Sequence, residues 1–345
     1  MAALTVQPGV ADSGRLETNP RSTEGGIEVE TLLVGLCGTD MEIVDGSYGT
    51  AAPGRERLII GHEAVGRVVE AHDASGFEAG DLVVPIVRRP DPVPCPSCAV
   101  GEWDMCQNGR YTEHGIKGAD GFARDRFPLD PTYAVGVPEE LDELAVLTEP
   151  ASVVAKAWEQ IERIGARAHW SPARVLVTGA GPIGLLAALM ARQRGFEVAV
   201  FDRATGGPKP DLVGDLGASY HTGDVDNAME EPDVVLECTG AAPVVFDVMG
   251  ISGPTGIVCL AGISSGHRTI EIEADAVNRQ MVLENLVVFG TVNANRRHYQ
   301  AAVDSLVAAD PAWLAGVITR RVALDDWEQA FEGGSDDVKV VLDLG

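Results

Sequence analysis

The stretch Val175-Leu-Val-Thr-Gly179-Ala-Gly181-Pro-Ile-Gly184 decides the fold of the second half of this chain. An apolar run ends in a G-x-G-x-x-G turn, and a helical pattern follows. In such a turn Gly179 allows a tight bend, Gly181 lets the backbone approach a pyrophosphate, and Gly184 lets helix and strand pack closely. The N–H groups at the start of the helix would then face phosphate groups. The cofactor-binding residues expected here are Gly179, Gly181, Pro182, Ile183 and Gly184.

The segments around this turn alternate between strand and helix patterns. Arg174–Thr178 and Glu197–Phe201 are apolar β runs on either side of a helix expected over Gly181–Gly195. Asp233–Glu237 and Gly256–Leu260 read as further buried strands. Such alternation predicts an α/β fold with a doubly wound parallel sheet. The alternative is a glycine-rich turn in another kind of α/β protein.

An acidic residue, Asp202, ends the second of these strands, 18 positions after Gly184. Its carboxylate can accept hydrogen bonds from both hydroxyls of an adenosine ribose. It would also repel the extra charge of a 2′-phosphate. Arg203 follows directly and could contact the ribose or a phosphate. We therefore expect NAD to be preferred over NADP, with residual NADP use supported by Arg203.

The first half of the chain has a different character, with short β patterns separated by glycine and aspartate. These strands are expected at Ile27–Leu36, Leu58–Ile60, Ala64–Glu70 and Leu82–Val87. Glu139–Ile164 then has helical spacing, which Glu149-Pro150 is expected to interrupt. The change near Leu141 indicates a boundary between two kinds of structure.

Composition excludes several classes of function. The 345 residues suffice for about two domains, and 26 basic against 52 acidic residues give a formal net charge of −26. A polyanion such as nucleic acid would be repelled by most of this surface. The longest apolar stretch, around Leu185–Met190, is far shorter than the ~18 residues of a membrane span. We expect a cytoplasmic protein that binds neither nucleic acid nor membrane.

Candidate metal ligands follow β patterns in the first half. Cys37 and His62 each come after an expected strand, and Glu149 precedes a proline. Cysteine, histidine and carboxylate are the ligands that zinc prefers, and a catalytic zinc keeps one position open. Each residue alone also has an ordinary explanation: a core cysteine, a surface histidine and a helix boundary. The residues alone leave both interpretations open.

A second group of thiols lies further along the first half of the chain. Cys95, Cys98 and Cys106 fall within twelve residues, whereas Cys238 and Cys259 stand at the ends of buried strands. In a cytosolic chain such a cluster favours a metal site over a disulfide framework. We expect Cys238 and Cys259 to be core residues.

The order of these motifs resembles that of a known enzyme superfamily. Cys37-Gly-Thr39-Asp40, Gly61-His62-Glu63-Ala-Val-Gly66, the cysteine cluster, Glu149-Pro150 and the glycine-rich turn occur in the sequence of the zinc-dependent medium-chain dehydrogenases/reductases. Further stretches are similar to archaeal-type glucose 1-dehydrogenases. These are Val87-Arg-Arg-Pro90, Glu113 to Phe122, Leu147-Thr-Glu-Pro150, and Met281 to Asn285 with Val292-Asn293.

The resemblance implies a GroES-like β-barrel catalytic domain over residues 1–155 and 295–345, with a Rossmann dinucleotide-binding domain inserted at 156–294. The active site would lie in the cleft between them. The resemblance also favours a homo-oligomer, a dimer or a tetramer. The alternating segment Thr269–Glu273 is one that could pair across a two-fold axis.

The resemblance also implies roles for individual residues. Cys37 and His62 would be zinc ligands, with the carboxylates of Glu63 and Glu149 as alternating ligands. Thr39 would pass the alcohol proton outward. The residues expected at the substrate are Asp40, which would also orient the metal site, Glu113, Glu149 and Asn293. Thr239 and Asn293 are expected at the cofactor.

Two positions depart from the family pattern. Glu284 stands where a histidine contacting the sugar is expected. In the cysteine cluster, the usual spacing C-x2-C-x2-C-x7-C places its first cysteine on Pro92, which cannot bind metal. Asp91 is the nearest substitute for the fourth ligand of a structural zinc beside Cys95, Cys98 and Cys106. The alternative is a lobe that holds no metal.

The resulting hypothesis is a zinc-dependent NAD(P) oxidoreductase that oxidises a sugar or polyol, glucose above all, by hydride transfer. The nearest alternative is a dehydrogenase of another polyol, an aminocyclitol or a biosynthetic sugar intermediate. A non-zinc quinone reductase or a nucleotide-binding relative without turnover is a more distant alternative. Such relatives normally lack the ligands that Cys37, His62 and Glu149 would supply.

Overall fold

The computed structural model describes residues 2–18, 26–264 and 268–345. The chain divides into two compact units. The first comprises Met1–Ser152 together with Asn293–Gly345, and the second comprises Val153–Val292. None of the described helices is both long enough and apolar enough to cross a membrane.

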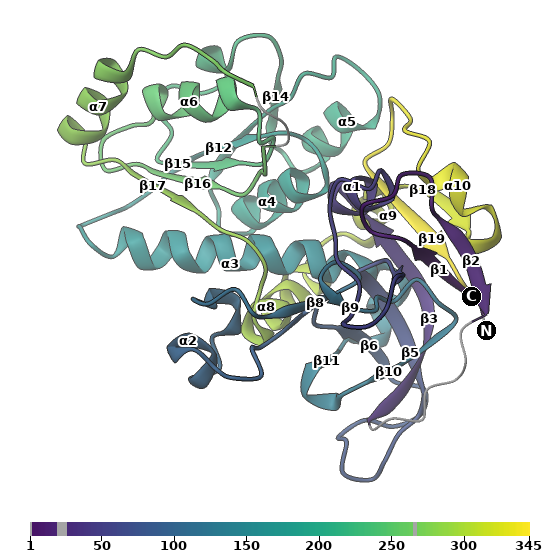
Figure 1. The fold of residues 1–345 in the computed structure, drawn as a ribbon. Coiled ribbons are helices and arrows are strands. Elements are labelled where there is room, and N and C mark those ends of the chain that lie inside the picture. Colours follow the sequence, from purple (N-terminus) through teal and green to yellow (C-terminus); the bar gives the residue numbers. More distant parts are fainter. Residues whose placement is uncertain (1, 19–25, 265–267) are drawn as a thin grey trace. The chain divides into compact units, whose positions relative to one another are not determined.

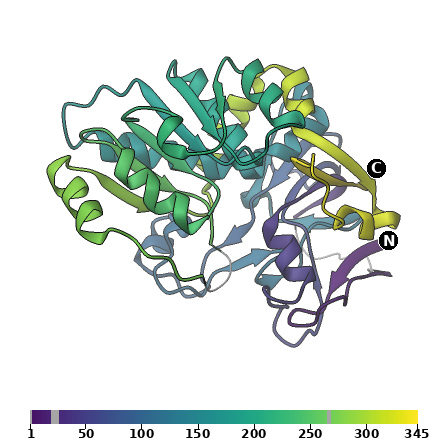
Figure 2. The same ribbon diagram turned by 90° about the horizontal axis from the view of Figure 1, so that it is seen from above.

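A mixed, mainly antiparallel sheet organises the first unit. Its strand order is β11-β6-β5-β3-β19-β18, and β10 also pairs with β3. The strands are β3 (Ile27–Leu36), β5 (Glu63–Glu70), β6 (Leu82–Pro85), β10 (Arg126–Leu129), β11 (Ala134–Gly136), β18 (Ile318–Ala323) and β19 (Lys339–Asp343). Val340 of β19 lies opposite Leu36 of β3. The last strand therefore lies beside one of the first, as Figures 1 and 2 show.

Two small sheets complete the β structure of this unit. One has the order β2-β1-β4 and the other the order β7-β8-β9. Their strands are β1 (Ala2–Val6), β2 (Arg15–Thr18), β4 (Leu58–Ile59), β7 (Arg88–Arg89), β8 (Thr112–His114) and β9 (Gly118–Ala119). The core of the unit joins these elements through buried side chains such as Leu4, Ile60, Phe122 and Leu342. Apolar burial of this kind is the main stabilising contribution to such a unit.

The helices of the first unit are short. The α-helices are α1 (Gly38–Val44), α2 (Pro96–Ala99), α8 (Arg296–Val307), α9 (Pro311–Val317) and α10 (Trp327–Ala330). The 3-10 turns are η1 (Trp103–Met105), η2 (Pro131–Tyr133), η3 (Glu139–Leu147) and η5 (Leu324–Asp326).

One expected helix differs from the structure. The pattern over Glu139–Ile164 forms η3, which contains a non-helical Asp142, and then the separate helix α3 (Thr148–Gly165). Pro150 does not interrupt a helix, because it stands in the first turn of α3. A proline is tolerated there, since the N–H that it lacks would have no partner within the helix. The expectation of an interruption at Glu149-Pro150 was therefore wrong.

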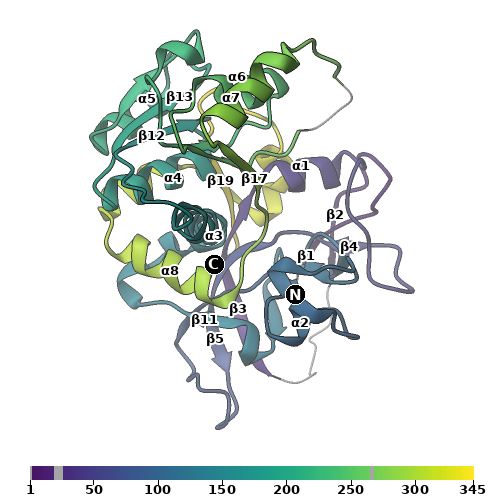
Figure 3. The same cartoon turned by 90° about the vertical axis from the view of Figure 1, so that its left-hand side faces the viewer.

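The second unit is built on a six-stranded parallel sheet with the order β14-β13-β12-β15-β16-β17, which confirms the doubly wound prediction. Its strands are β12 (Arg174–Thr178), β13 (Glu197–Phe201), β14 (Ser219–His221), β15 (Val234–Glu237), β16 (Ile257–Leu260) and β17 (Val287–Gly290). Its helical elements are α4 (Pro182–Gln193), α5 (Pro208–Asp215), η4 (Val225–Asn227), α6 (Ala242–Ile251) and α7 (Ala274–Leu283). Helices α4 and α6 cover opposite faces of the sheet (Figures 1 and 3).

The sheet order reverses between β12 and β15, because β13 and β14 lie on one side of β12 and the later strands on the other. Ligands of open parallel sheets bind at such a switch point, beyond the carboxyl ends of the strands. The glycine-rich turn follows β12 directly. The alternating segment Thr269–Glu273 forms no strand in the described part of the chain and precedes α7.

Candidate active site

Cys37 follows β3 and is the residue that caps α1. Its sulfur accepts the backbone N–H of Thr39 at 3.3 Å. Its own N–H donates to the Asp40 carboxylate at 3.0 Å. These two bonds form a reciprocal cap, so the strand end and the first helical turn fix the position of the thiol. Thr39 lies beside it, partly exposed.

His62 lies against this thiol and this carboxylate. Its Nε2 is 3.3 Å from the Cys37 sulfur, and its Nδ1 is 3.4 Å from Asp40 Oδ1. Burial opposes a charge on the imidazole, but Asp40 and Cys37 outweigh it and raise the pKa of His62 well above its ordinary value. Gly61 precedes it at a φ of +83°. A Cβ at Gly61 would clash with Val34, so only glycine allows this approach.

Glu63 and a lysine far away in sequence form a buried ion pair. The Nζ of Lys339 contacts Glu63 Oε2, and both side chains are almost completely buried. The same Nζ donates to the carbonyl of Leu36 at 3.0 Å. A Cβ on Gly35 would overlap both partners, so this glycine makes room for the pair. Sequence analysis missed Lys339, because no local motif marks it.

Glu149 completes this group from the first turn of α3. It is 8% exposed. Burial, and then the nearby charge of Glu63, raise the pKa of the Glu149 carboxyl to about 7. Two sets of possible ligand atoms result, each with all its atoms within 4.8 Å of one another. One set is Cys37, Asp40 and His62, and the other is His62, Glu63 and Glu149.

The donor set fits a zinc ion on its chemistry. Thiolate, imidazole and carboxylate are its preferred ligands. Several buried polar atoms here have no hydrogen-bond partner, which is costly unless another group satisfies them. Thr148 Oγ1 is one of them, and His62 Nδ1 and Asp40 Oδ1 have only each other, at 3.4 Å. The structure thus brings Cys37, His62, Glu63 and Glu149 together, with Asp40 against the histidine.

A second polar cluster of the same unit gathers around Glu113. Its Oε1 accepts Nε and Nη2 of the buried Arg88, at 3.1 and 2.9 Å. Asn293 Nδ2 donates to the same oxygen at 3.1 Å. The expected substrate residues Glu113 and Asn293 therefore lie in contact. Arg88 thus forms a buried ion pair with Glu113, whereas Arg89 packs on the Tyr133 ring.

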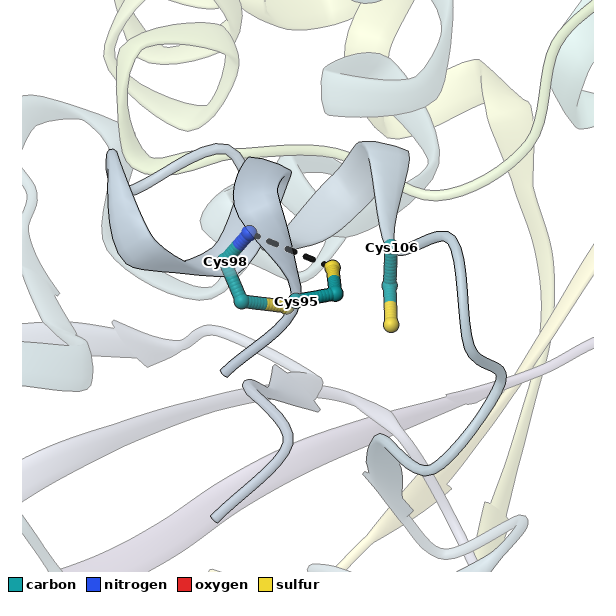
Figure 4. A group of neighbouring side chains, drawn as sticks. All are labelled: Cys95, Cys98 and Cys106. Atoms are coloured by element: carbon teal, nitrogen blue, oxygen red, sulfur yellow. Dashed lines mark hydrogen bonds between the residues drawn. The ribbon is translucent and has the colours of Figure 1, made fainter. Parts of the chain in front are cut away.

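The cysteine lobe brings its three thiols together (Figure 4). The N–H groups of Gln107 and Cys98 donate to the Cys95 sulfur and lower the pKa of this thiol to about 6. Asp91 does not join this group of ligand atoms. Its carboxylate instead contacts Arg110, Asn108 and the N–H of Val93.

The glycine-rich turn of the second unit has the geometry that its sequence predicts. Gly179 has a φ of +88°. A Cβ at Gly184 would overlap the carbonyl oxygen of Gly179, so helix α4 can pack here only with glycine. A Cβ at Gly181 would meet no protein atom within 4 Å. The space above Gly181 is therefore open to a ligand, beside the N-terminus of α4 that carries Pro182 and Ile183.

Asp202 lies directly after β13 but is engaged by the protein. It accepts the N–H of Ala180 at 2.6 Å and that of Ala204 at 2.8 Å. Lys209 also pairs with it. Burial opposes the charge of Asp202, but these donors prevail and lower the pKa of its carboxyl. Arg203 is exposed and has no hydrogen bond or ion pair to the residues that the structure describes.

Thr239 follows β15 in the loop beside Gly179. Its N–H and hydroxyl both donate to Glu237 Oε1, and the N–H of Gly240 reaches the same carboxylate. Glu237, fully buried, thus fixes this loop, a role that sequence analysis missed. Glu284, the other departure noted in the sequence, caps the end of α7 in the second unit.

Two family models match the chain in succession. Residues 23–139 match the alcohol dehydrogenase GroES-like domain. Residues 142–344 match the glucose dehydrogenase C-terminus family. The expected fold class, a GroES-like barrel with a parallel-sheet nucleotide domain, is therefore confirmed.

Known proteins resemble the whole chain. A glucose 1-dehydrogenase of Methanocella arvoryzae is 39% identical, with 100% of both chains covered. The glucose 1-dehydrogenase of Halobacterium salinarum is 37% identical over 95% of each chain. The structure also matches that of Haloferax mediterranei glucose dehydrogenase in complex with NADP, Zn and gluconolactone, with a TM-score of 0.92 and 31% identity over 100% of this chain and 99% of that one. This chain belongs to the zinc-dependent medium-chain dehydrogenase/reductase family.

Proposed function

We propose that this chain is a glucose 1-dehydrogenase that uses zinc and a nicotinamide cofactor and oxidises glucose at its anomeric carbon. The observation that carries the proposal is the buried group of Cys37, His62, Glu63 and Glu149, whose possible ligand atoms belong to two sets that share His62, each with its atoms within 4.8 Å of one another. The full-length similarity to glucose 1-dehydrogenases supports it. When bound, zinc would supply a Lewis acid for the substrate oxygen and NAD(P) a hydride acceptor.

The residues of the first unit would have distinct roles in metal binding and proton transfer. Cys37 and His62 hold the metal, and Asp40 orients the imidazole through its Nδ1. Glu149 completes the ligand set. Glu63 is held in an ion pair with Lys339 and alternates with Glu149 as a ligand. Thr39, which is partly exposed, passes the proton of the alcohol outward.

Glu113 and Asn293 would bind the sugar and the nicotinamide. Two N–H donors of Arg88 and the Asn293 amide converge on Oε1 of Glu113. The carboxylate is thereby held rigidly, and its second oxygen can accept a sugar hydroxyl. Asn293 has a φ of +62°, a conformation that asparagine tolerates better than most residues. The contacts that hold both residues in place are independent of substrate, so the site would be pre-organised.

In the second unit, the turn from Gly179 to Gly184 would hold the pyrophosphate, with Thr239 beside it. We propose that Asp202 gives a preference for NAD over NADP, because an acid at this position repels a 2′-phosphate. Arg203 supports residual NADP use. The ratio of kcat/KM for the two cofactors measures this preference directly, and a native enzyme that favours NADP would contradict it.

A second candidate function differs from the first in its substrate. Glu284 stands in place of the histidine expected in glucose dehydrogenases. This observation favours another polyol, an aminocyclitol or a biosynthetic sugar intermediate. Initial rates of NAD(P)H formation with glucose and with a panel of such compounds decide between them. If glucose is inert while another polyol is oxidised, the second candidate replaces the first.

The zinc mechanism predicts that Cys37→Ser and His62→Ala abolish turnover but leave cofactor binding intact. Each change removes a zinc ligand, whereas the glycine-rich turn belongs to the other compact unit. The measurements are turnover with glucose, zinc content of the purified protein, and cofactor affinity. Cys259→Ser, a change of a buried cysteine in the second unit, serves as the matched control. Substantial turnover in metal-free protein would refute the mechanism.

Three further expectations belong to the same proposal. Cys95, Cys98 and Cys106 hold a second, structural zinc, and Asp91 serves as its fourth ligand after leaving Arg110. The chain assembles into a dimer or tetramer, for which β17, an edge strand of the parallel sheet among the described strands, offers backbone groups. The compartment is the cytoplasm, where cysteines such as these remain reduced.

A further inference from the structure

Lys209 forms an ion pair with Asp202, the acid that is expected to accept hydrogen bonds from the adenosine ribose. It stands in the first turn of α5, and its Nζ lies 3.3 Å from Asp202 Oδ2 and 3.5 Å from Oδ1. The side chains are 20% and 8% exposed. The pair is thus largely withdrawn from water, where an ion pair is screened less than on the surface.

The carboxylate of Asp202 is fully occupied by the protein. Ala180 donates to one oxygen and Ala204 to the other, and Lys209 reaches both. An ionised carboxylate offers about four acceptor positions. The hydroxyls of an incoming ribose would therefore compete with Lys209 for the same oxygens.

Lysine is rare in this chain, and none of its four lysines is merely a solvated charge. The other three contact the Tyr111 ring (Lys117), the carbonyl of Val292 (Lys156) and Glu63 (Lys339). In a protein with a net charge of −26, a lysine on the cofactor acid is a specific feature. With the exposed Arg203 next to it, two cations flank one acid.

We propose that Lys209 partly neutralises Asp202 and thereby lets the chain bind an adenosine that carries a 2′-phosphate, so that NADP is accepted beside the preferred NAD. The inference rests on the proposed function, since it assumes that a nicotinamide dinucleotide binds at the glycine-rich turn. A phosphate at the ribose then meets a carboxylate whose charge is partly balanced, so that the repulsion is weakened but not abolished. An unphosphorylated ribose, in contrast, must displace the lysine. Lys209 therefore favours the phosphorylated ligand and slightly disfavours the other.

The test uses two fragments that lack nicotinamide, AMP and adenosine 2′,5′-bisphosphate, and measures their affinities by titration calorimetry. Lys209→Met should weaken the bisphosphate about ten-fold or more, since the acid then repels it without compensation. AMP should bind equally well or more tightly. Lys209→Arg, which keeps the charge, should restore the wild-type ratio. Arg163→Met, which removes one cation paired with Glu159 on α3, should leave the ratio unchanged.

The Asp202→Ser background tests whether the lysine acts through the acid. There the effect of Lys209→Met on the bisphosphate should shrink to less than about three-fold, because no carboxylate remains to be neutralised. A full-sized loss in this background would overturn the inference in favour of direct contact with the phosphate. An unchanged ratio in Lys209→Met would overturn it while leaving the proposed function intact. If the wild type binds neither fragment, the dinucleotide site itself fails and the inference fails with it.

Discussion

Two buried ion pairs of the first unit lie where chemistry is proposed. Lys339 pairs with Glu63 beside the thiol of Cys37, and Arg88 pairs with Glu113. An isolated buried charge is strongly destabilising, whereas a well-bonded pair is tolerated. These lysine and arginine residues therefore hold the two carboxylates in place where a metal or a sugar would need them.

Glu113 illustrates how such a pair serves both stability and binding, and the two roles can be separated. Glu113→Ala would leave the Arg88 guanidinium buried without its partner, costing ~3–5 kcal/mol of unfolding free energy. The double variant Arg88→Met with Glu113→Met should recover much of this loss, because neither charge remains. The proposed contact with substrate predicts that kcat/KM stays reduced in the double variant, by a factor that corresponds to a loss of ~2–3 kcal/mol of transition-state stabilisation. Urea titration and steady-state kinetics measure the two effects.

The control for this prediction is Arg126→Met with Glu30→Met, a more exposed pair in the same unit. It should change the unfolding free energy by less than ~1 kcal/mol and leave kcat/KM unaltered. Recovery of kcat/KM together with stability in the Arg88–Glu113 double variant would contradict a substrate role for Glu113.

A second single residue, His114, should make the free energy of unfolding depend on pH. Burial, with Arg89 nearby, lowers the pKa of this imidazole to about 3, and the ring stacks on Phe122. In the unfolded chain its pKa is about 6.5. The unfolded state therefore binds an additional proton below that pH, so stability falls as pH falls from about 6.5 towards 3. The slope from this group is at most ~1.4 kcal/mol per pH unit.

Urea unfolding between pH 7 and pH 5 measures this dependence. His114→Asn should be less stable at pH 7, because it loses the stacking contact and the bond to the Asp120 carbonyl. Its stability should nevertheless change less with pH than that of the wild type. Parallel pH curves for the two proteins would contradict a depressed pKa for His114.

At the scale of elements, the structure shows why some parts were predictable. The geometry of the turn from Gly179 to Gly184 was predicted correctly, because Gly179 and Gly184 meet local steric requirements within one strand–turn–helix unit, whereas Gly181 leaves open space. The start of α3 at Thr148 was missed, since helical spacing alone does not reveal a change from 3-10 to α geometry. Lys339 and Lys209 were missed because their partners come from other elements, and only the folded chain brings them together.

The cysteine lobe is the element whose chemistry remains a prediction. If Cys95, Cys98 and Cys106 hold zinc, purified protein should contain about two zinc ions per chain, one in each ligand set. Cys98→Ser should remove one of them, lower thermal stability, and leave the catalytic zinc in place. Elemental analysis together with thiol titration of the native protein measures this. One zinc per chain with three freely reactive thiols would contradict a metal in the lobe.

For the whole molecule, the decisive property is the excess of acids. A formal net charge of −26 on 345 residues makes the folded state repel itself, and compactness increases that cost. Salt shortens the range of the repulsion, because the screening length falls from about 10 Å at 0.1 M to about 3 Å at 1 M. The exposed ion pairs weaken as well, but each of them contributes only ~0–1 kcal/mol.

The repulsion should therefore outweigh the surface pairs, and stability should rise with salt. We expect the thermal midpoint of unfolding to increase by several degrees between 0.1 and 1 M NaCl, since ~1 kcal/mol shifts a domain of this size by about 2–4 °C. Calorimetric scans in NaCl and KCl check this, and equal effects of both salts identify screening rather than a specific ion site. Replacing exposed acids with neutral residues, as in Asp325→Asn with Asp326→Asn, should flatten the dependence. A midpoint that falls as salt is added would mean that ion pairs, not net charge, dominate the electrostatics of this fold.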